Sequence, residues 1–551
     1  MIIGRVTATE KQPTSCTKLF FWVDPKTIIR PFDIVRVKHL SQYENKYSYT
    51  YAIVQNLEYI TDSASHLAGF VSFDFGDTSS HPQNDRIGTT IAEAEVLYND
   101  GEIEMPVHDG AEVEWADSEG VKEALGVKAY KEPIPAGYIS MSNGQEVQVS
   151  LEADYLLGPE GAHLNIAGIS GLATKTSYVM FLLNSIQQKK DDVSIIIFNV
   201  KGADLLSIDE ENPDIDDVKK DAWRKCGLDP APFHDVTYLY PFTSKRTSTG
   251  FYTTSHAHPD ILSSQIEQDK AYNYFYSYED MREKFDLLFS DIDDPNSTFE
   301  SIFHEIASSD DFEKLSWDEF MELVRTRTAK GGTDKTISVL SWRKFYRLLI
   351  SRKEKYGLFT GKVKMDSGAK RLKSIRDSLR EIKPGKVIVI DIEPLPFYLQ
   401  CLVVGDVIQT IYGSKLGDIE DIDSRSMGRV VIFADELNKF APKQGEGGKS
   451  LTQSLLEVTE RGRSLGTVLF GAEQFRSGVH DRVLGNSSTN VYGRSSPVEI
   501  TKCPDYRYFP EAYRSAITRL PQGSLLIQHA VFKTALVKVL FPFPVYFQPK
   551  G

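Results

Sequence analysis

Apolar and polar residues alternate in short runs over about the first 150 residues. Turn residues separate these runs, for example Asp24-Pro25 and Asn143-Gly144. Short alternating runs at regular intervals are typical of antiparallel strands, so residues 1–150 predict a small β-barrel or sandwich that serves in assembly. The expected strands are Lys18–Val23, Asp33–Val37, Tyr47–Gln55, Gly69–Phe73, Thr90–Tyr98 and Glu146–Leu151.

From about residue 160 the pattern changes to continuous apolar runs that alternate with helix-like segments. Runs that are apolar on both faces are typical of the central strands of a parallel sheet covered by helices. We therefore expect residues 151–204 and 384–551 to form an α/β core with a C-terminal tail. The expected central strands are Val193–Val200, Lys386–Ile392, Arg429–Glu436 and Gly466–Ala472.

The segment 205–383 shows apolar residues at spacings of three and four, which predicts a mainly helical insertion. The expected helices are Tyr278–Phe289, Ser297–Ala307, Trp317–Thr326 and Thr336–Lys353. The end of the segment is basic and contains Lys362, Lys364, Lys370, Arg371, Lys373 and Arg376. Two interpretations of this basic cluster stay open, a contact to nucleic-acid phosphates and a solvated helix face.

Composition narrows the class of protein. Of the 551 residues, 41 % are hydrophobic and 25 % are charged, and 63 basic against 77 acidic residues give a net charge of −14. This balance argues against a protein coated in positive charge for non-specific DNA binding. The 4 cysteines form no CxxC pair, so neither a disulfide framework nor a zinc site is indicated. No signal-peptide layout or long apolar run is present, and we expect a cytoplasmic protein without a membrane partner.

A candidate phosphate-binding loop lies between Ala162 and Ser177. The stretch predicts a short strand, a turn with glycine, and Lys175-Thr176 at the start of an apolar helix. A phosphate loop needs this order, because backbone N–H groups wrap the phosphates, the lysine reaches them and the hydroxyl holds Mg²⁺. The candidate nucleotide-binding residues are Gly168, Gly171, Ala173, Thr174, Lys175, Thr176 and Ser177.

The loop departs from the usual pattern GxxxxGK followed by Ser or Thr. Ile169 and Thr174 occupy the positions of the two glycines. An ordinary strand–turn–helix unit is therefore the alternative interpretation.

The apolar run that begins at Arg429 ends in Asp435-Glu436 and matches a Walker B element. In such an element the aspartate orients Mg²⁺ through its water shell and the glutamate polarises the attacking water. The loop hydroxyl that would hold Mg²⁺ is that of Thr176. The alternative is an acidic pair that caps the following helix.

Three further polar residues are candidates for catalysis. Arg461 and Arg463 flank a glycine just before the next expected strand, and Gln474 follows that strand. An arginine can stabilise charge in phosphoryl transfer across a subunit boundary, and Gln474 can sense the γ-phosphate or position water. Arginines at a helix C-terminus are also favoured by the helix dipole alone.

Together these residues resemble the HerA-type ATPases of the HerA–FtsK superfamily. The resemblance covers the N-terminal β module, the phosphate loop, Asp435-Glu436, Gly462–Gly466, Ala472–Gln474, the tail from Leu520 to Leu526, and Val537–Pro544 after it. It implies a RecA-like core, ATP and Mg²⁺ between the protomers of a homohexamer, and Arg461 or Arg463 acting in trans. In this family double-stranded DNA often passes through the pore of the ring, so the resemblance also implies a possible DNA path.

The chain departs from the family at Thr174 and at Leu437-Asn438, where Ala-His is common. The change at Thr174 concerns the rate of hydrolysis more than nucleotide binding. The glycine-rich loop from Ala441 to Lys449 follows the Asp-Glu pair and is a candidate pore loop.

Within the family the chain looks most like the bacterial anti-phage branch, in which the ring acts with an effector such as a sirtuin-like NAD-consuming enzyme or a nuclease. The leading hypothesis is thus an ATP-driven DNA translocase or helicase-like motor in defence. The alternative is a nucleotide-bound scaffold that organises the effector without translocation. A protein-remodelling ATPase is a third possibility.

Overall fold

A computed structural model of the protein describes residues 1–40, 47–79, 87–169, 174–244, 251–292, 294, 297–329, 337–353, 357–360, 371–443 and 449–549. The chain forms two compact units. The first consists of Met1–Glu152, Asp505–Leu520 and Ser524–Leu540, and the second of Ala153–Pro504, Pro521–Gly523 and Phe541–Gly551. The polypeptide therefore returns to the first unit after it has completed most of the second.

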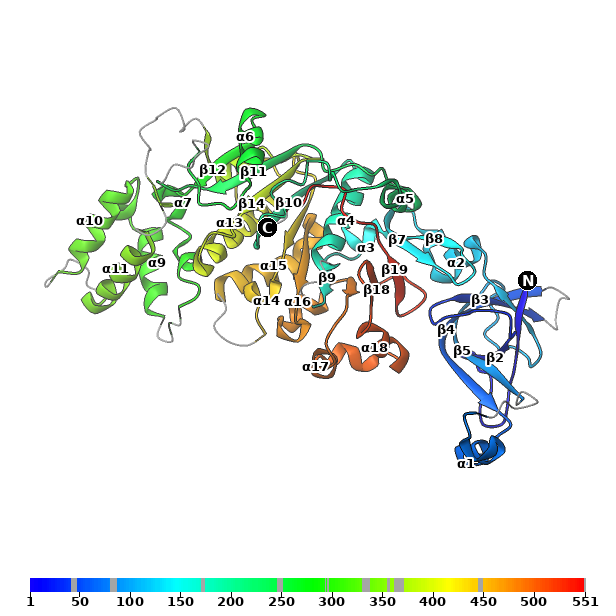
Figure 1. Ribbon diagram of the computed structural model, residues 1–551. Coiled ribbons are helices and arrows are strands. Elements are labelled where there is room, and N and C mark those ends of the chain that lie inside the picture. Colours follow the sequence, from blue (N-terminus) through cyan, green and yellow to red (C-terminus); the bar gives the residue numbers. More distant parts are fainter. Residues whose placement is uncertain are drawn as a thin grey trace. The chain divides into compact units, whose positions relative to one another are not determined.

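The first unit contains a closed antiparallel barrel with the strand order β1-β2-β5-β4-β3-β6 (Figure 1). Alternate side chains such as Ile3, Phe21 and Val35 are buried inside it, as the alternating sequence pattern requires. The barrel expected from the sequence is confirmed. Its strands are β1 (Ile2–Val6), β2 (Lys18–Val23), β3 (Ile34–Leu40), β4 (Tyr47–Thr61), β5 (Gly88–Asn99) and β6 (Glu112–Trp115).

The same unit holds four antiparallel strands in the order β18-β19-β7-β8 among the described residues. The C-terminal segment that contains the Pro-Gln-Gly sequence supplies two of them. The remaining elements near this sheet are short helices. The bounds are α2 (Ser118–Leu125), η2 (Val127–Ala129), β7 (Pro133–Ser140), β8 (Glu146–Glu152), η6 (Pro504–Tyr508), α18 (Glu511–Ile517), β18 (Ser524–His529) and β19 (Val537–Leu540).

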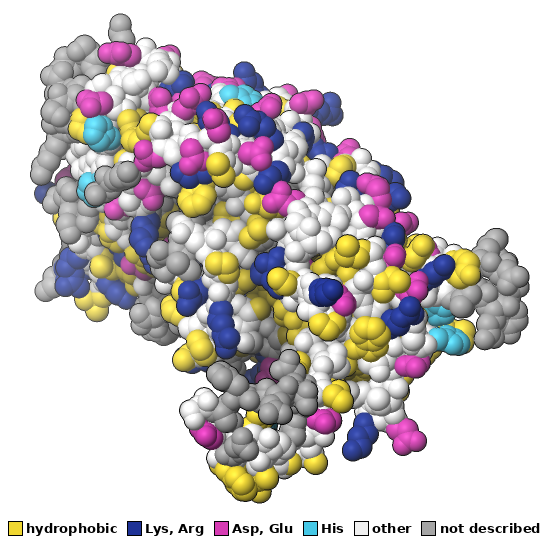
Figure 2. All heavy atoms as spheres, turned by 45° about the vertical axis from the view of Figure 1, so that its right-hand side comes forward, with side chains coloured by type: hydrophobic (Ala, Val, Ile, Leu, Met, Phe, Trp, Pro, Cys, Tyr) yellow, Lys and Arg dark blue, Asp and Glu magenta, His cyan; other side chains and the backbone are white. Residues whose placement is uncertain are grey.

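One expected strand of the first unit is wrong. Gly69–Phe73 falls mainly in helix α1 (His66–Ser72), which is followed by η1 (Asp74–Gly76). Ser65 Oγ accepts a hydrogen bond from the N–H of Ala68 at 3.1 Å and caps the first turn. No α1 residue is buried, and Figure 2 shows hydrophobic side chains at the lowest point of its view, where α1 lies. The apolar run therefore forms a surface patch rather than a buried strand.

The second unit is built on a parallel sheet with the order β13-β12-β11-β14-β10-β15-β16-β9-β17. Every residue of β9, β10, β14 and β16 is buried, which explains their continuous apolar runs. The RecA-like α/β fold class is confirmed. The strands are β9 (Leu164–Ala167), β10 (Val193–Asn199), β11 (Val236–Pro241), β12 (Ala271–Phe275), β13 (Leu372–Ser374), β14 (Val387–Asp391), β15 (Arg429–Ala434), β16 (Thr467–Glu473) and β17 (Thr489–Tyr492).

Helices cover the faces of this sheet. The helix α4 (Thr174–Lys189) is buried along nearly all its length and packs on β9, β10 and β16, while α13 (Phe397–Leu416) packs against α15 (Lys449–Leu465). The shorter helices are α3 (Ala153–Leu156), α5 (Asp217–Lys225), α6 (Pro259–Glu267), α12 (Ile375–Arg380), α14 (Leu437–Phe440), η5 (Arg476–Gly478), α16 (Asp481–Gly485) and α17 (Pro497–Lys502).

The segment 205–383 supplies helices α9 (Thr298–Ser308), α10 (Trp317–Arg327) and α11 (Val339–Lys353), which lie together in Figure 1. It also supplies β11, β12 and β13, so it widens the sheet as well. The single helix expected over Tyr278–Phe289 is wrong, because the chain forms α7 (Tyr278–Met281) and α8 (Phe285–Leu288). Between them Lys284 has φ −123° and forms an ion pair with buried Asp406. No helix in the described ranges is long and apolar enough to cross a membrane.

Candidate nucleotide site

The candidate phosphate loop connects β9 to α4. Gly168 follows β9 directly, and Thr174 is the first residue of α4, with Lys175, Thr176 and Ser177 in the first turn. Gly171 and Ala173 lie outside the described residues. The loop therefore leads into the N-terminus of a long helix, where backbone N–H groups and the helix dipole favour an anion.

The loop hydroxyl and the strand-end carboxylate lie together. Thr176 Oγ1 donates a hydrogen bond of 3.0 Å to Asp435 Oδ2, although 259 positions separate the two residues. Asp435 follows β15, which is separated from β9 by β16 in the sheet. A hydroxyl beside a carboxylate is a donor set that suits Mg²⁺, which prefers oxygen ligands.

Lys175 is held in the same place and is only 7 % exposed. Burial lowers the pKa of its ammonium group, whereas the nearby carboxylates of Asp435, Glu436 and Glu473 raise it. The positive charge of Lys201, just after β10, also lowers the pKa of Lys175. The lysine therefore lies among three carboxylates at the carboxyl ends of the strands, where ligands bind in parallel sheets.

Glu436 and Gln474 also meet. Gln474 Nε2 donates a hydrogen bond of 3.2 Å to Glu436 Oε1, and the N–H of Glu436 donates to Asp435 Oδ1 at 2.8 Å. Glu436 has φ +55°, a left-handed conformation that is uncommon for residues other than glycine. Such strain often accompanies functional positions, and the amide of Gln474 fixes the direction of the carboxylate.

Glu473 is a functional candidate that the sequence interpretation missed. Its side chain is 0 % exposed, and within the described part of the chain neither carboxylate oxygen has a hydrogen-bond partner. Burial raises the pKa of this carboxyl to about 8, although Arg476 and Lys175 oppose the shift. The signal available in the sequence was a carboxylate at the end of an apolar strand, next to Gln474.

Arg461 and Arg463 lie away from these residues. Both are exposed near the end of α15, and Arg463 Nη1 donates to the carbonyl of Glu160 at 3.3 Å. They precede β16, whereas Asp435 follows the parallel strand β15. With a rise of about 3.3 Å per residue, the length of the strands places them roughly 20 Å from Asp435. Neither arginine can complete the site of its own chain.

The candidate DNA contacts whose side chains the structure describes form ion pairs. Arg371 pairs with Asp269, Lys373 with Glu381 and Arg376 with Asp421. Lys362, Lys364 and Lys370 lie outside the described residues. In the candidate pore loop, Lys443 Nζ lies 2.7 Å from Asp481 Oδ1, and residues 444–448 lie outside the described ranges.

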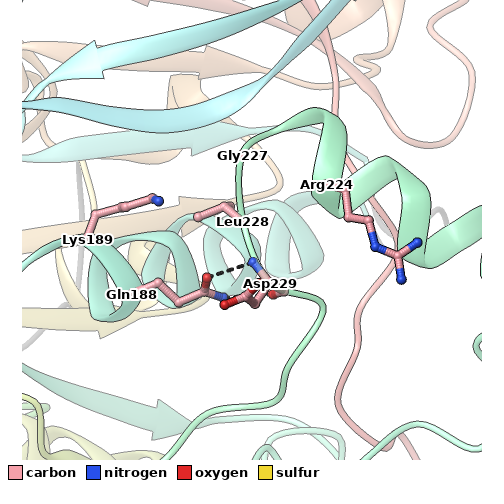
Figure 3. A pocket seen from close by; sticks show the side chains of 6 residues that line it. All are labelled: Gln188, Lys189, Arg224, Gly227, Leu228 and Asp229. Carbon is pink, nitrogen blue, oxygen red and sulfur yellow. Dashed lines mark hydrogen bonds between the residues drawn. The ribbon is translucent and has the colours of Figure 1, made fainter.

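A separate surface hollow lies at the far end of α4. Its lining consists of Gln188, Lys189, Arg224, Gly227, Leu228 and Asp229. Figure 3 shows the side chains of Lys189 and Arg224 well apart, so the two cations do not converge on one point. Gln188 lies 13 positions after Lys175 on α4, which corresponds to about 20 Å along the helix. The hollow is therefore distinct from the nucleotide site.

No protein-family model and no curated protein matches the sequence. Among solved structures, the chain is similar to the plasmid coupling protein TrwB in complex with the GTP analogue GDPNP, at 14 % identity and a TM-score of 0.42, over 73 % of this chain and 90 % of that chain. It is similar to VirB4 of Thermoanaerobacter pseudethanolicus at 13 % identity and a TM-score of 0.43, over 75 % and 96 %. The genome packaging NTPase B204 of Sulfolobus turreted icosahedral virus 2, with ATP-gammaS, matches at 13 % identity and a TM-score of 0.22, over 31 % and 72 %.

Proposed function

We propose that the protein is a P-loop ATPase that binds ATP with Mg²⁺ and hydrolyses it. The observation that carries this proposal is the hydrogen bond between Thr176 Oγ1 and Asp435 Oδ2. It joins the helix that follows the phosphate loop to the strand that ends in Asp-Glu. Buried Lys175 lies beside the same carboxylate, so the donors for Mg²⁺ and the cation for the phosphates occupy one place.

Each residue has a role in phosphoryl transfer. Thr176 and Asp435 would hold Mg²⁺, which neutralises phosphate charge in such sites. Lys175 and the N-terminal N–H groups of α4 bind the phosphate oxygens. Glu436 accepts the proton of the attacking water, and Gln474 keeps its carboxylate directed by donating to Oε1.

The site is completed by a neighbouring copy in this proposal. Arg461 and Arg463 are exposed at the amino ends of the strands, opposite the phosphate loop. They are therefore available to the nucleotide of another protomer. A planar guanidinium from that protomer stabilises charge that develops on the transferred phosphoryl group. This arrangement suits a HerA-type ring, for which we propose a homohexamer.

We further propose that the ring acts in the cytoplasm with an effector enzyme, a sirtuin-like NAD-consuming enzyme or a nuclease, in anti-phage defence. No two cysteines of the described residues form a disulfide, which agrees with a reducing compartment. In the motor form of the proposal, hydrolysis moves double-stranded DNA through the pore.

A scaffold without translocation is the second candidate. The ion pairs at Arg371, Lys373 and Arg376 favour it, because cations already matched by carboxylates are poorer phosphate contacts. In this form, bound ATP holds the ring in shape and the ring activates its effector.

The ATPase proposal is tested with Lys175→Ala and Glu436→Gln. We expect Lys175→Ala to abolish ATP binding, because it removes the buried cation. Glu436→Gln should bind ATP but lower kcat on the order of 100-fold or more, since the proton acceptor is lost. The measurements are equilibrium binding of Mg-ATP and the rate of phosphate release, each made without and with the proposed effector.

Lys189→Ala, at the far end of α4, and Glu457→Gln, on α15, are the matched controls and should behave like wild type. A Glu436→Gln variant with wild-type turnover would contradict the proposal. Duplex DNA that accelerates hydrolysis, with the acceleration lost on replacing Lys443 and Lys449, would favour the motor. Effector activation that survives Glu436→Gln would favour the scaffold.

A further inference from the structure

Arg494 lies beside the candidate phosphate loop, on the flank opposite Glu473. It follows β17, which pairs with β9 so that Tyr492 is opposite Ala167. The pairing continues beyond both strands, because Gly493 N donates to the carbonyl of Ala167 at 2.8 Å and Ile169 N donates to the carbonyl of Arg494 at 2.7 Å. The backbone of Arg494 is thus fixed at the level of the first loop residues.

The close approach of two glycines keeps the segments together. A Cβ atom on Gly168 would lie 3.3 Å from the carbonyl oxygen of Arg494 and 3.3 Å from Gly493 Cα. A Cβ atom on Gly493 would lie 3.3 Å from the carbonyl oxygen of Ala167. At these distances a side chain at either position would make the neighbouring backbone shift by a few tenths of an ångström. The two glycines therefore allow the backbone of Arg494 to lie close to the start of the loop.

The side chain of Arg494 is exposed and makes no hydrogen bond or ion pair within the part of the chain that the structure describes. The neighbouring Arg476 differs. It is 3 % exposed and donates to Asn165 Oδ1 and Asn490 Oδ1, both at 2.8 Å. Arg476 is therefore committed to joining β9 and β17, whereas the guanidinium of Arg494 is free to bind a ligand.

The charges around the loop are uneven. Asp435, Glu436 and Glu473 lie on the β15 and β16 side, where their charges act on Lys175. A nucleotide brings several more negative charges to this site. A cation on the β17 side would offset part of that charge, and guanidinium groups bind phosphate oxygens through two donors at once.

We propose that Arg494 binds the phosphate tail of the nucleotide held by its own chain. This inference rests on the proposed ATPase function and adds a residue that lies outside the phosphate-loop and Asp-Glu motifs. Arg494 then acts in cis, from the strand beside the loop, in contrast to the arginine expected from a neighbouring copy.

The test measures binding of Mg-ATP and, by competition, of inorganic triphosphate to the full-length protein and its variants. Arg494→Ala should weaken both ligands by about tenfold or more, because a charge-assisted hydrogen bond to phosphate is lost. Arg494→Lys should recover part of the affinity. Arg425→Ala removes an exposed arginine that precedes β15, at the amino ends of the strands and away from the phosphate loop. This control should leave both affinities unchanged.

The two ligands separate a phosphate contact from a contact with the base or ribose. Unchanged affinity of Arg494→Ala for inorganic triphosphate would overturn the inference, whatever happens to Mg-ATP. Lys175→Ala distinguishes this failure from failure of the proposed function. If Lys175→Ala loses Mg-ATP and Arg494→Ala does not, only the role of Arg494 is wrong. If neither variant loses Mg-ATP, the nucleotide site itself is wrong.

Discussion

Glu473 occupies a position in which its charge is poorly accommodated. The carboxyl is fully buried and has no hydrogen-bond partner among the described residues, so the neutral form is favoured and the pKa rises to about 8. In an unfolded chain the same group titrates near 4.5. Between these two values the unfolded state releases a proton that the folded state keeps, and folding loses stability as the pH rises.

We predict that Glu473→Gln stabilises the protein increasingly as the pH rises from about 5 to 8. The stability that the neutral carboxyl provides is complete below pH 4.5 and is lost as the pH rises through 8, whereas the glutamine cannot ionise. The gain above pH 8 should be on the order of a few kcal/mol. Thermal unfolding at several pH values measures it, with Glu457→Gln as the control. A difference between Glu473→Gln and wild type that does not vary with pH would show that the carboxyl is not held neutral.

Near its C-terminal end, helix α15 packs closely on the start of strand β16 at Gly462. A Cβ atom there would lie 2.5 Å from the backbone carbonyl oxygen of Thr467, and backbone cannot move aside as a flexible side chain can. The glycine between Arg461 and Arg463 is therefore needed for close packing of the helix on the sheet. The same close contact also fixes the position of the end of α15, which carries both arginines.

Gly462→Ala should destabilise the protein by about 1–3 kcal/mol, although alanine is the better helix former. The matched control is Gly485→Ala in α16, where a Cβ atom would meet nothing within 4 Å and where no loss is expected. Chemical denaturation of both variants provides the comparison. Equal stability of Gly462→Ala and wild type would mean that the end of α15 can shift away from β16.

The central strands could be predicted from the sequence because burial on both faces leaves long apolar runs, as in β10 and β14. The run Gly69–Phe73 misled for the opposite reason, since it is apolar but exposed on α1. Motif spacing indicated Thr176 and Asp435, but their contact depends on the strand order. Arg494 could not be found at all, because only the pairing of β17 with β9 brings it to the loop.

At the scale of the whole molecule, the residues of the proposed site are divided between the carboxyl ends and the amino ends of the strands of one sheet. The phosphate loop and Asp-Glu pair lie at the carboxyl ends of the strands, and Arg461 and Arg463 lie at the other ends. In the proposed ring, each protomer contributes the nucleotide-binding residues to one interface and the completing arginine to the next.

This division predicts that two inactive variants restore activity when they are mixed. Lys175→Ala lacks a working nucleotide site, and the double variant Arg461→Ala, Arg463→Ala lacks the arginine for its neighbour. An active interface needs an intact nucleotide site from one protomer and intact arginines from its neighbour. In an equimolar assembly each of the two is intact at about one interface in two, so about a quarter of the interfaces are active. Phosphate release should therefore recover to about a quarter of the wild-type rate. Continued inactivity of a mixture that does co-assemble would exclude an arginine in trans.

Because the loop and the arginines lie at opposite ends of the strands, the two surfaces by which a protomer would contact its neighbours are different. Contacts between unlike surfaces are head-to-tail, and such contacts close into a ring only when the rotation between neighbours divides a full turn evenly. Any other rotation produces an open helical filament. In the proposed ring, a change at Gly462, which lies between Arg461 and Arg463 in the last turns of α15, would therefore alter the form of the assembly as well as the stability. Electron microscopy of Gly462→Ala tests whether closed particles are replaced by fibres.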